Sequence, residues 1–226
     1  MNYRYELKYY LNSNKDHLFQ VWIRKFKDYQ KTYDSRVVNS LYFDTIFLRS
    51  ANDNIMGISN RQKYRIRWYG ESFDTNVNIE IKNRNGRIGS KILIPTDLKL
   101  DQINLKKLFN NNKLLRKNIL FDKLNSDLYI NNLKPILYVK YTRHYFKIGK
   151  NLRVTYDICP KYKLSDDLNH DLKMKYLEDE INVIEIKFLE EHLEEARLIL
   201  KKVPFVVKRH SKYLRGLAKC GLASYV

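Results

Sequence analysis

The stretch KYRIRWYG places Lys63, Arg65 and Arg67 at every second position. Because successive side chains of a β-strand point to opposite faces, these cations would share one face and leave Tyr64, Ile66 and Trp68 on the other. Guanidinium groups bind phosphate oxygens in a two-pronged geometry, and ammonium groups bind them as point charges. The stretch therefore predicts a strand with one strongly cationic face suited to phosphate.

The same alternation recurs elsewhere in the chain, with a glutamate placed two residues before a lysine. The pairs are Glu6-Lys8, Glu80-Lys82 and Glu185-Lys187. Arg143 and Arg153 alternate in the same sense with apolar or aromatic neighbours. Carboxylates are ligands that hard divalent cations prefer. Cationic strands with interspersed carboxylates indicate a site for a chain of phosphates together with a divalent metal ion.

A plainer interpretation is the solvated outer face of an antiparallel sheet. Such a face usually mixes charge signs and uses Ser, Thr and Gln, whereas these faces favour Arg and Lys in several strands. If the sheet closes, helices can cover its apolar side and the charged side would line the interior. Unpaired buried charges cost several kcal/mol each, so an interior of this kind needs water, an anion, or both.

Composition points to a polyanionic partner. The 226 residues suffice for one well-buried domain or at most two small ones, and 43 Lys+Arg against 25 Asp+Glu give a net charge of +18. Nucleic acid, an anionic membrane surface and a phosphate-rich ligand all qualify. Two distant cysteines without metal or disulfide spacing suggest reduced core thiols in a cytoplasmic protein. No signal core is present, and no apolar run approaches the roughly 20 residues of a membrane span.

Hydrophobic periodicity predicts an antiparallel-rich α+β fold. The expected strands are 3–11, 36–43, 61–69, 77–84, 87–94, 135–147, 151–159 and 181–188. The expected helices lie after an N-cap at Ser13, at 46–54, within 104–131, at 190–201 and at 211–220, and 161–179 is predicted as a charged loop. The first helix would bury Leu18, Trp22 and Phe26, and NRNGR predicts a hairpin. Eight strands can close into a barrel with a narrow interior. Because no Pro/Gly/Ser linker divides the chain, we expect a single domain over residues 1–226.

These stretches together resemble the VTC domain, the polyphosphate polymerase domain of vacuolar transporter chaperone proteins, in the triphosphate tunnel metalloenzyme superfamily that is related to the CYTH proteins. The resemblance covers nearly the whole chain and runs through RYELKYYL, SLYFDT, KYRIRWYG, IEIKNRNGRIGSK, YVKYTRHYF, LRVTYD, VIEIKF and KRHSKYLRG. It implies an eight-stranded antiparallel β-barrel tunnel with helices outside. It also implies transfer of the ATP γ-phosphate to a growing polyphosphate chain with Mn²⁺ or Mg²⁺.

The resemblance further implies roles for individual residues. It implies phosphate ligands among the basic residues, and our own hypothesis divides them: Arg65, Arg67, Lys82 and Lys91 hold the donor phosphates, and Arg143, Arg153, Arg209 and Lys212 hold the γ-phosphate and acceptor end. Further phosphate-binding candidates are Lys8, Lys63 and Ser211. Glu185 matches the metal-binding glutamate, with Glu6 and Glu80 as additional candidates. No nucleophile–base pair stands out, which suits phosphoryl transfer driven by positioning and charge neutralisation.

Two departures from the related patterns are visible. CYTH proteins begin E-x-E-x-K, whereas this chain has Arg4 in the first glutamate position, which favours the VTC branch and removes one metal carboxylate. Arg209 stands where the VTC pattern has lysine, which keeps the charge and changes the donor geometry.

Three rival functions remain open at the level of sequence. A triphosphatase could use the same tunnel, because water and a phosphate-chain end compete for similar chemistry. A nonenzymatic sensor of polyphosphate or nucleotide is a second possibility, against which Glu185 argues. A nucleic-acid binder would use the charge and the 18 tyrosines, but the cations alternate within strands instead of clustering in a tail. We expect ATP or another triphosphate and polyphosphate as partners, no nucleic acid, and a membrane partner of unknown identity.

Overall fold

The computed structural model describes residues 4–72, 75–86, 88–99, 132–165 and 176–225. Its main feature is a mostly antiparallel sheet with the strand order β1-β9-β7-β6-β2-β3-β4-β5 and with β8 beside β7. The strands are β1 (Arg4–Asn12), β2 (Tyr29–Asp44), β3 (Asn60–Tyr69), β4 (Asn76–Asn85), β5 (Ile88–Lys99), β6 (Lys134–Ile148), β7 (Leu152–Leu164), β8 (Leu177–Glu178) and β9 (Ile181–Leu189). The order begins at β1 and ends at β5, so the sheet formed by the described strands is not closed.

Short helices accompany the sheet. They are η1 (Ser13–Lys15), α1 (Asp16–Ile23), α2 (Arg49–Ile55), η4 (Glu190–His192), α5 (Leu193–Leu200) and α6 (Lys212–Lys219). The predicted α+β class is confirmed, and all eight expected strands are present. The helices expected within 104–131 lie outside the described residues. The expected loop at 161–179 is strand near both of its ends, because β7 continues to Leu164 and β8 spans Leu177–Glu178.

The chain divides into two compact units. Unit 1 comprises Met1–Val38, Lys140–Lys161 and Tyr176–Ser211, and unit 2 comprises Asn39–Val139, Tyr162–Lys175 and Lys212–Val226. The long strands β2, β6 and β7 each contribute residues to both units.

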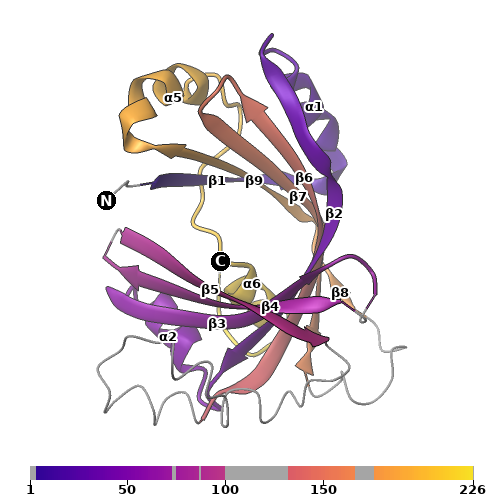
Figure 1. Cartoon of the computed structure of the whole chain (residues 1–226), viewed down its shortest axis with the longest axis vertical. Helices are drawn as coiled ribbons and strands as arrows, with labels where there is room; N and C mark the ends of the chain where they lie inside the picture. Colours follow the sequence, from indigo (N-terminus) through magenta and orange to yellow (C-terminus); the bar gives the residue numbers. More distant parts are fainter. Residues whose placement is uncertain (1–3, 73–74, 87, 100–131, 166–175, 226) are drawn as a thin grey trace. The chain divides into compact units, whose positions relative to one another are not determined.

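Unit 1 has a core of aromatic and aliphatic side chains around α1. β1 and β9 lie side by side, as Figure 1 shows, and pair in antiparallel register. Phe19, Trp22 and Ile23 of α1 are fully buried, and Phe19 stacks on Tyr156 of β7 with ring centroids 4.2 Å apart. Phe26 is also buried as predicted, but Leu18 is 38% exposed because Phe19 occupies the inward position instead.

The start of the first helix differs from the prediction. The side chain of Asn12, not Ser13, accepts a hydrogen bond from the Asn14 amide and caps the 3₁₀ turn η1. The Ser13 amide donates to the Glu180 carbonyl at 2.7 Å, a contact with a residue far away in sequence. The α-helix therefore begins only at Asp16.

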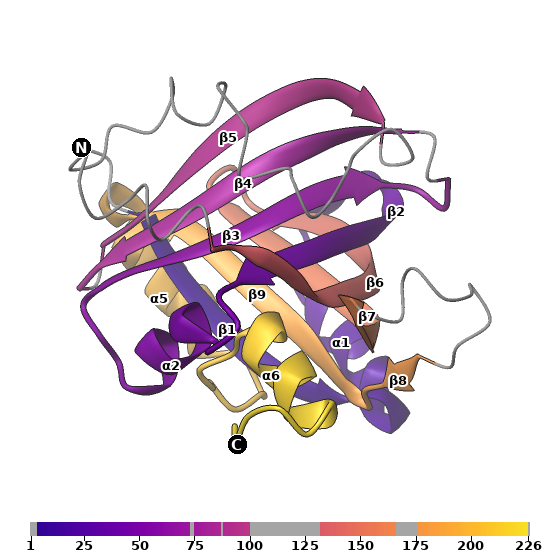
Figure 2. The same ribbon diagram turned by 90° about the horizontal axis from the view of Figure 1, so that it is seen from below.

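Unit 2 contains the β3-β4-β5 meander, whose strands lie next to one another in Figure 2. The predicted hairpin between β4 and β5 is present, and Gly86 has a φ of 57° that suits a residue without a side chain. Tyr64, Ile66 and Trp68 of β3 are buried together with Ile79 and Ile81 of β4.

Two further features bear on the predictions. Cys159 is exposed and Cys220 is partly exposed, so the expectation that both are core thiols is wrong. In the part of the chain that the structure describes, every helix is too short or too polar to cross a bilayer.

Candidate functional site

The cationic face predicted for KYRIRWYG is present in unit 2. Arg65 and Arg67 lie on the face of β3 opposite Tyr64 and Ile66 and are only 6% and 7% exposed. This burial excludes a solvated outer face for these two guanidiniums. Arginines taken out of water need counter-charges or other hydrogen-bond acceptors, which the neighbouring strands must supply.

Strand register sets the neighbours of these arginines. Arg65 lies opposite Glu80 of β4, and Lys63 lies opposite Lys82. Lys82 in turn lies opposite Lys91 of β5, so a row of lysines crosses three strands. Lys82 and Lys91 are exposed, in contrast to the arginines. The face therefore has buried guanidinium groups on β3 and accessible ammonium groups on β4 and β5.

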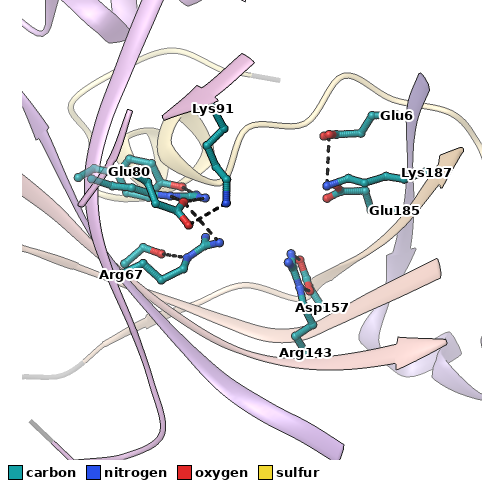
Figure 3. A network of polar contacts seen from close by, with 11 residues as sticks. Glu6, Arg67, Glu80, Lys91, Arg143, Asp157, Glu185 and Lys187 are labelled. Atoms are coloured by element: carbon teal, nitrogen blue, oxygen red, sulfur yellow. Dashed lines mark hydrogen bonds and ion pairs between the residues drawn. The ribbon is translucent and has the colours of Figure 1, made fainter. Parts of the chain in front are cut away.

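Glu80 is the buried counter-charge of this face. Its Oε2 accepts hydrogen bonds from Arg65 Nε at 2.7 Å and Nη2 at 2.5 Å, and its Oε1 accepts one from Lys91 Nζ at 3.3 Å. Arg67 Nη1 lies 3.8 Å from Oε2, and Figure 3 shows Arg67 and Lys91 directed at this carboxylate. Burial alone raises the pKa of Glu80, but Arg65, Arg67 and Lys91 lower that pKa to about 2.

Strand β2 supplies neutral partners for the same arginines. Arg67 Nε donates to Ser40 Oγ at 3.2 Å, and Arg65 Nη1 donates to the Tyr42 hydroxyl at 3.0 Å. Ser40 and Tyr42 are buried and share a face of the strand because they are two residues apart. Both arginines are therefore held by a neutral oxygen as well as by a carboxylate.

Unit 1 carries a second charged face, across β1 and β9. Their register places Glu6 opposite Lys187 and Lys8 opposite Glu185. The Glu6 carboxylate forms ion pairs with Lys8 Nζ at 2.8 Å and with Lys187 Nζ at 3.4 Å, and Lys187 also forms an ion pair with Glu185. In Figure 3 Glu6 and Glu185 both approach Lys187. The two E-x-K motifs are therefore interleaved in space.

The lysines keep both carboxylates of this face ionised. Burial raises the pKa of Glu185, but Lys8, Lys187 and Arg143 hold that pKa well below its ordinary value. Burial and the negative charge of Glu185 raise the pKa of Glu6. The positive charges of Lys8 and Lys187 have the larger effect, so the pKa of Glu6 lies below its ordinary value.

Arg143 of β6 is held by Asp157 of β7. Arg143 Nε and Nη2 donate to the two carboxylate oxygens at 2.5 and 2.7 Å, and Asp157 is completely buried. Burial lowers the pKa of Arg143, but Asp157 and Tyr141 raise it well above its ordinary value. This two-pronged pair fixes the plane of the guanidinium.

Strand β7 extends the same face. Thr155 lies opposite Glu185 and Arg153 lies opposite Lys187. Arg153 is exposed, whereas the Thr155 Oγ1 atom is buried and has no hydrogen-bond partner among the described residues. An unsatisfied buried hydroxyl beside a carboxylate calls for a ligand or water.

The segment after α5 runs along β1. The Lys208 amide donates to the Lys8 carbonyl at 3.0 Å, Lys8 Nζ donates to the His210 carbonyl at 3.2 Å, and the Tyr10 hydroxyl donates to the Arg209 carbonyl at 3.2 Å. These contacts hold Arg209 beside the E-x-K motif of β1.

The structure therefore sorts the predicted residues into two groups. Unit 1 holds Glu6, Lys8, Arg143, Arg153, Glu185, Arg209 and Ser211. Unit 2 holds Lys63, Arg65, Arg67, Glu80, Lys82, Lys91 and Lys212. Lys212, which was grouped by sequence with Arg143, belongs to unit 2 and lies near enough to Tyr42 to lower its pKa.

Sequence reasoning missed residues that hold the cations in place. They are Ser40, Tyr42 and Asp157. The unsatisfied hydroxyl of Thr155 was missed as well. The alternation of Ser40, Tyr42 and Asp44 in SLYFDT was a usable signal, because it is a polar face on an otherwise apolar strand.

The carboxylates differ in how they suit a divalent metal. The Glu80 side chain is only 3% exposed and is paired with Arg65, Arg67 and Lys91, which leaves it as a counter-charge. Both oxygens of Glu6 are paired with lysines as well, but the Glu6 side chain is 36% exposed. Glu6 and Glu185 lie on adjacent strands beside the unsatisfied Thr155 hydroxyl. No group of three or more acidic, His or Cys side chains suited to a metal occurs among the described residues. A two-carboxylate site completed by water and phosphate oxygens fits Mg²⁺.

Comparison with known proteins gives the fold and the family. No curated protein matches the chain. The fold is similar to a candidate adenylyl cyclase from Hippeastrum, described as having a dominant triphosphatase activity, at 13% identity over 99% of this chain and 98% of that chain with a TM-score of 0.55. It is also similar to a candidate adenylate cyclase from Bacillus halodurans, at 14% identity over 93% and 95% with a TM-score of 0.55.

A third solved structure is a candidate adenylate cyclase from Vibrio parahaemolyticus, with 12% identity over 96% of this chain and 98% of that chain and a TM-score of 0.53. At these identities the likeness concerns the fold, which is that of the triphosphate tunnel proteins. The sequence profile of the VTC domain matches residues 3–220, and the chain therefore belongs to the VTC domain family.

Proposed function

We propose that the protein is a metal-dependent phosphotransferase that moves the γ-phosphate of ATP to the end of a polyphosphate chain. The observation that carries the proposal is the interleaved face of unit 1. There Glu6 and Glu185 share Lys187, and Arg143 is locked by Asp157. Membership of the VTC domain family supports polyphosphate as the polymer.

In this proposal Glu6 and Glu185, and not Glu80, hold the divalent metal. Mn²⁺ or Mg²⁺ would neutralise charge on phosphate oxygens during transfer. The ammonium groups of Lys8 and Lys187, which pair with the carboxylates in the structure, would turn to phosphate oxygens. Arg143 is preorganised for the same task, because its pairing with Asp157 is bidentate and buried.

The face of unit 2 would bind phosphates as well. Arg65 and Arg67 are buried and fixed in place, and Lys91 is exposed. A bound phosphate group would compete with Glu80 for these cations. Because the guanidiniums are already positioned, little ordering entropy remains to be lost on binding.

A triphosphatase is the second candidate. The observation that favours it is the fold shared with the Hippeastrum protein, which is described as having a dominant triphosphatase activity. The same bound triphosphate would then be attacked by water in place of a chain end. The two candidates differ in their product and not in their binding residues.

One incubation distinguishes these functions. Purified protein is mixed with ATP and Mn²⁺ or Mg²⁺, and both orthophosphate and polymer are measured, the polymer by gel staining. We expect polymer. Orthophosphate without polymer would establish the triphosphatase, and binding of polyphosphate with no turnover would overturn the enzymatic proposal.

Variants test the assigned residues. Glu185→Gln and Arg65→Ala should each lower the rate of polymer formation at least about 100-fold, because the first removes a carboxylate that would hold the metal and the second removes a positive charge that would stabilise the transferring group. Glu194→Gln is the matched control, because Glu194 lies in α5 with a side chain that is 81% exposed. Full activity in either of the first two variants would refute the role assigned to that residue.

A further inference from the structure

The Arg65 guanidinium has two kinds of hydrogen-bond acceptor, a carboxylate and a neutral hydroxyl group. Its Nε and Nη2 donate to the carboxylate of Glu80, and its Nη1 donates to the hydroxyl of Tyr42 at 3.0 Å. The guanidinium carbon also lies 5.7 Å from the centre of the Tyr42 ring, a cation–π distance. Tyr42 is only 7% exposed and therefore has a fixed position.

The carboxylate of Glu80 and the hydroxyl of Tyr42 differ in how a bound anion affects them. Glu80 is negative, so a phosphate group arriving at Arg65 competes with it for the same N–H donors. The Tyr42 hydroxyl is neutral and does not repel phosphate. Tyr42 can therefore keep the guanidinium in its orientation while Glu80 is being replaced.

The surroundings of Tyr42 support this division. Its ring stacks on Tyr213 of α6, with centroids 5.0 Å apart and planes 18° apart. Burial raises the pKa of Tyr42, but Arg65, Arg67 and Lys212 lower it below its ordinary value. The phenol oxygen therefore lies in a positive electrostatic environment, as expected next to an anion-binding face.

The rest of the SLYFDT strand has separate partners. Ser40 accepts from Arg67 at 3.2 Å. Asp44 accepts from the Tyr213 hydroxyl at 2.8 Å and from the amides of Ser50 and Ala51 at the start of α2. Ser40 and Tyr42 thus contact the phosphate-binding arginines, and Asp44 contacts the helices.

We propose that Tyr42 is a positioning residue for triphosphate binding, whose hydroxyl holds Arg65 in the orientation that receives phosphate oxygens. This inference rests on the proposed function, because it takes the unit 2 face to be a phosphate-binding face. Loss of the Tyr42 hydroxyl should therefore weaken triphosphate binding more than it lowers the stability of the fold.

The test compares two tyrosines of one stacked pair. Tyr42→Phe and Tyr213→Phe both keep the aromatic stack, and each removes one buried hydroxyl. Binding of inorganic tripolyphosphate is measured by calorimetry, and the melting temperature is measured on the same samples. We expect Tyr42→Phe to weaken affinity by about 10- to 150-fold, the usual size for a hydrogen bond to a charged group. Tyr213→Phe should lower the melting temperature with affinity changed less than about 2-fold, because its partner is Asp44.

A double-mutant cycle shows whether Tyr42 acts through Arg65. Arg65→Lys keeps the positive charge but has no Nη1 group for the hydroxyl to hold. In this background Tyr42→Phe should cause no further loss of affinity. A loss of the original size would mean that Tyr42 contacts the ligand itself, and it would overturn the positioning role.

The remaining outcomes separate the two proposals. If the unaltered protein neither binds tripolyphosphate nor turns over ATP, the proposed function fails and the inference fails with it. If the unaltered protein binds and Tyr42→Phe binds equally well, only the inference fails. Equal loss of affinity in Tyr42→Phe and Tyr213→Phe, in proportion to lost stability, would make the role of Tyr42 structural and also overturn it.

Discussion

Buried charged side chains in both units are held by partners of opposite charge or by neutral hydroxyl groups. Glu80 meets Arg65, Arg67 and Lys91, and Asp157 meets Arg143. Removing one partner from such a set leaves an uncompensated buried charge, which is strongly destabilising. The carboxylates thus serve to keep the cations in place.

The pH dependence of stability should report on Glu80. Its pKa is about 2 in the folded protein against an ordinary value of 4.5. Because the folded pKa is depressed, the stabilisation is present above the ordinary value and is lost as the pH falls toward the folded value. Between about pH 6 and about pH 3 the loss attributable to Glu80 is about 2 kcal/mol of unfolding free energy.

Urea unfolding at both pH values measures this contribution. Glu80→Gln has no titrating group at this position, so its unfolding free energy should fall less steeply with acid than that of the unaltered protein. Glu194→Gln, altered at an exposed carboxylate, should follow the unaltered protein. Parallel slopes for the unaltered protein and Glu80→Gln would show that the Arg65–Glu80 pair does not depress this pKa.

At the scale of elements, α6 is attached to unit 2 by close packing. Tyr213, Leu214 and Leu217 of this helix are buried, and Tyr213 reaches Asp44 at the end of β2. Gly216 is buried as well. A Cβ atom there would lie 2.5 Å from a Leu137 side-chain atom and 2.6 Å from a Tyr162 ring atom. The glycine is therefore required by proximity and not by backbone conformation.

Gly216→Ala should therefore destabilise the protein. In an exposed helix this change stabilises by about 1 kcal/mol, but here the added methyl must displace Leu137 and Tyr162, and overpacking of this kind costs about 1–3 kcal/mol. The measurement is the urea midpoint, with Lys219→Ala as a control at an exposed position of the same helix. A midpoint that rises in Gly216→Ala would show that α6 can move away from the sheet at little cost.

At the scale of the whole molecule, a net charge of +18 disfavours the compact state. Salt screens this repulsion, with a Debye length of about 10 Å at 0.1 M. Bound polyanions relieve it and add binding free energy, which amounts to about 2.7 kcal/mol at a ligand concentration of 100 times Kd.

We expect the melting temperature to rise modestly with sodium chloride and much more with tripolyphosphate at the same ionic strength. The tripolyphosphate effect should follow a saturation curve, because a defined site fills. Scanning calorimetry or fluorescence against ligand concentration provides the measurement. Equal increases for both salts would indicate screening alone and no specific site.

Much of the architecture could be predicted because alternation is a local property. In β3 the sequence pattern correctly separated Arg65 and Arg67 from Tyr64 and Ile66. The hairpin at Gly86 followed from turn chemistry in the same way. The N-cap at Ser13 was predicted wrongly, because the Asn12 side chain caps a 3₁₀ turn that precedes the α-helix.

The amino-acid sequence by itself determined which side chains share a strand face, the excess of positive charge, and the motifs that identify the VTC domain family. Only the tertiary structure decided that Glu80 neutralises Arg65, that Glu6 and Glu185 share Lys187, and that Tyr42 contacts Arg65. The physical reason is strand register. A shift of two residues keeps every side chain on its face and leaves the local pattern unchanged, yet it gives each charge a different neighbour.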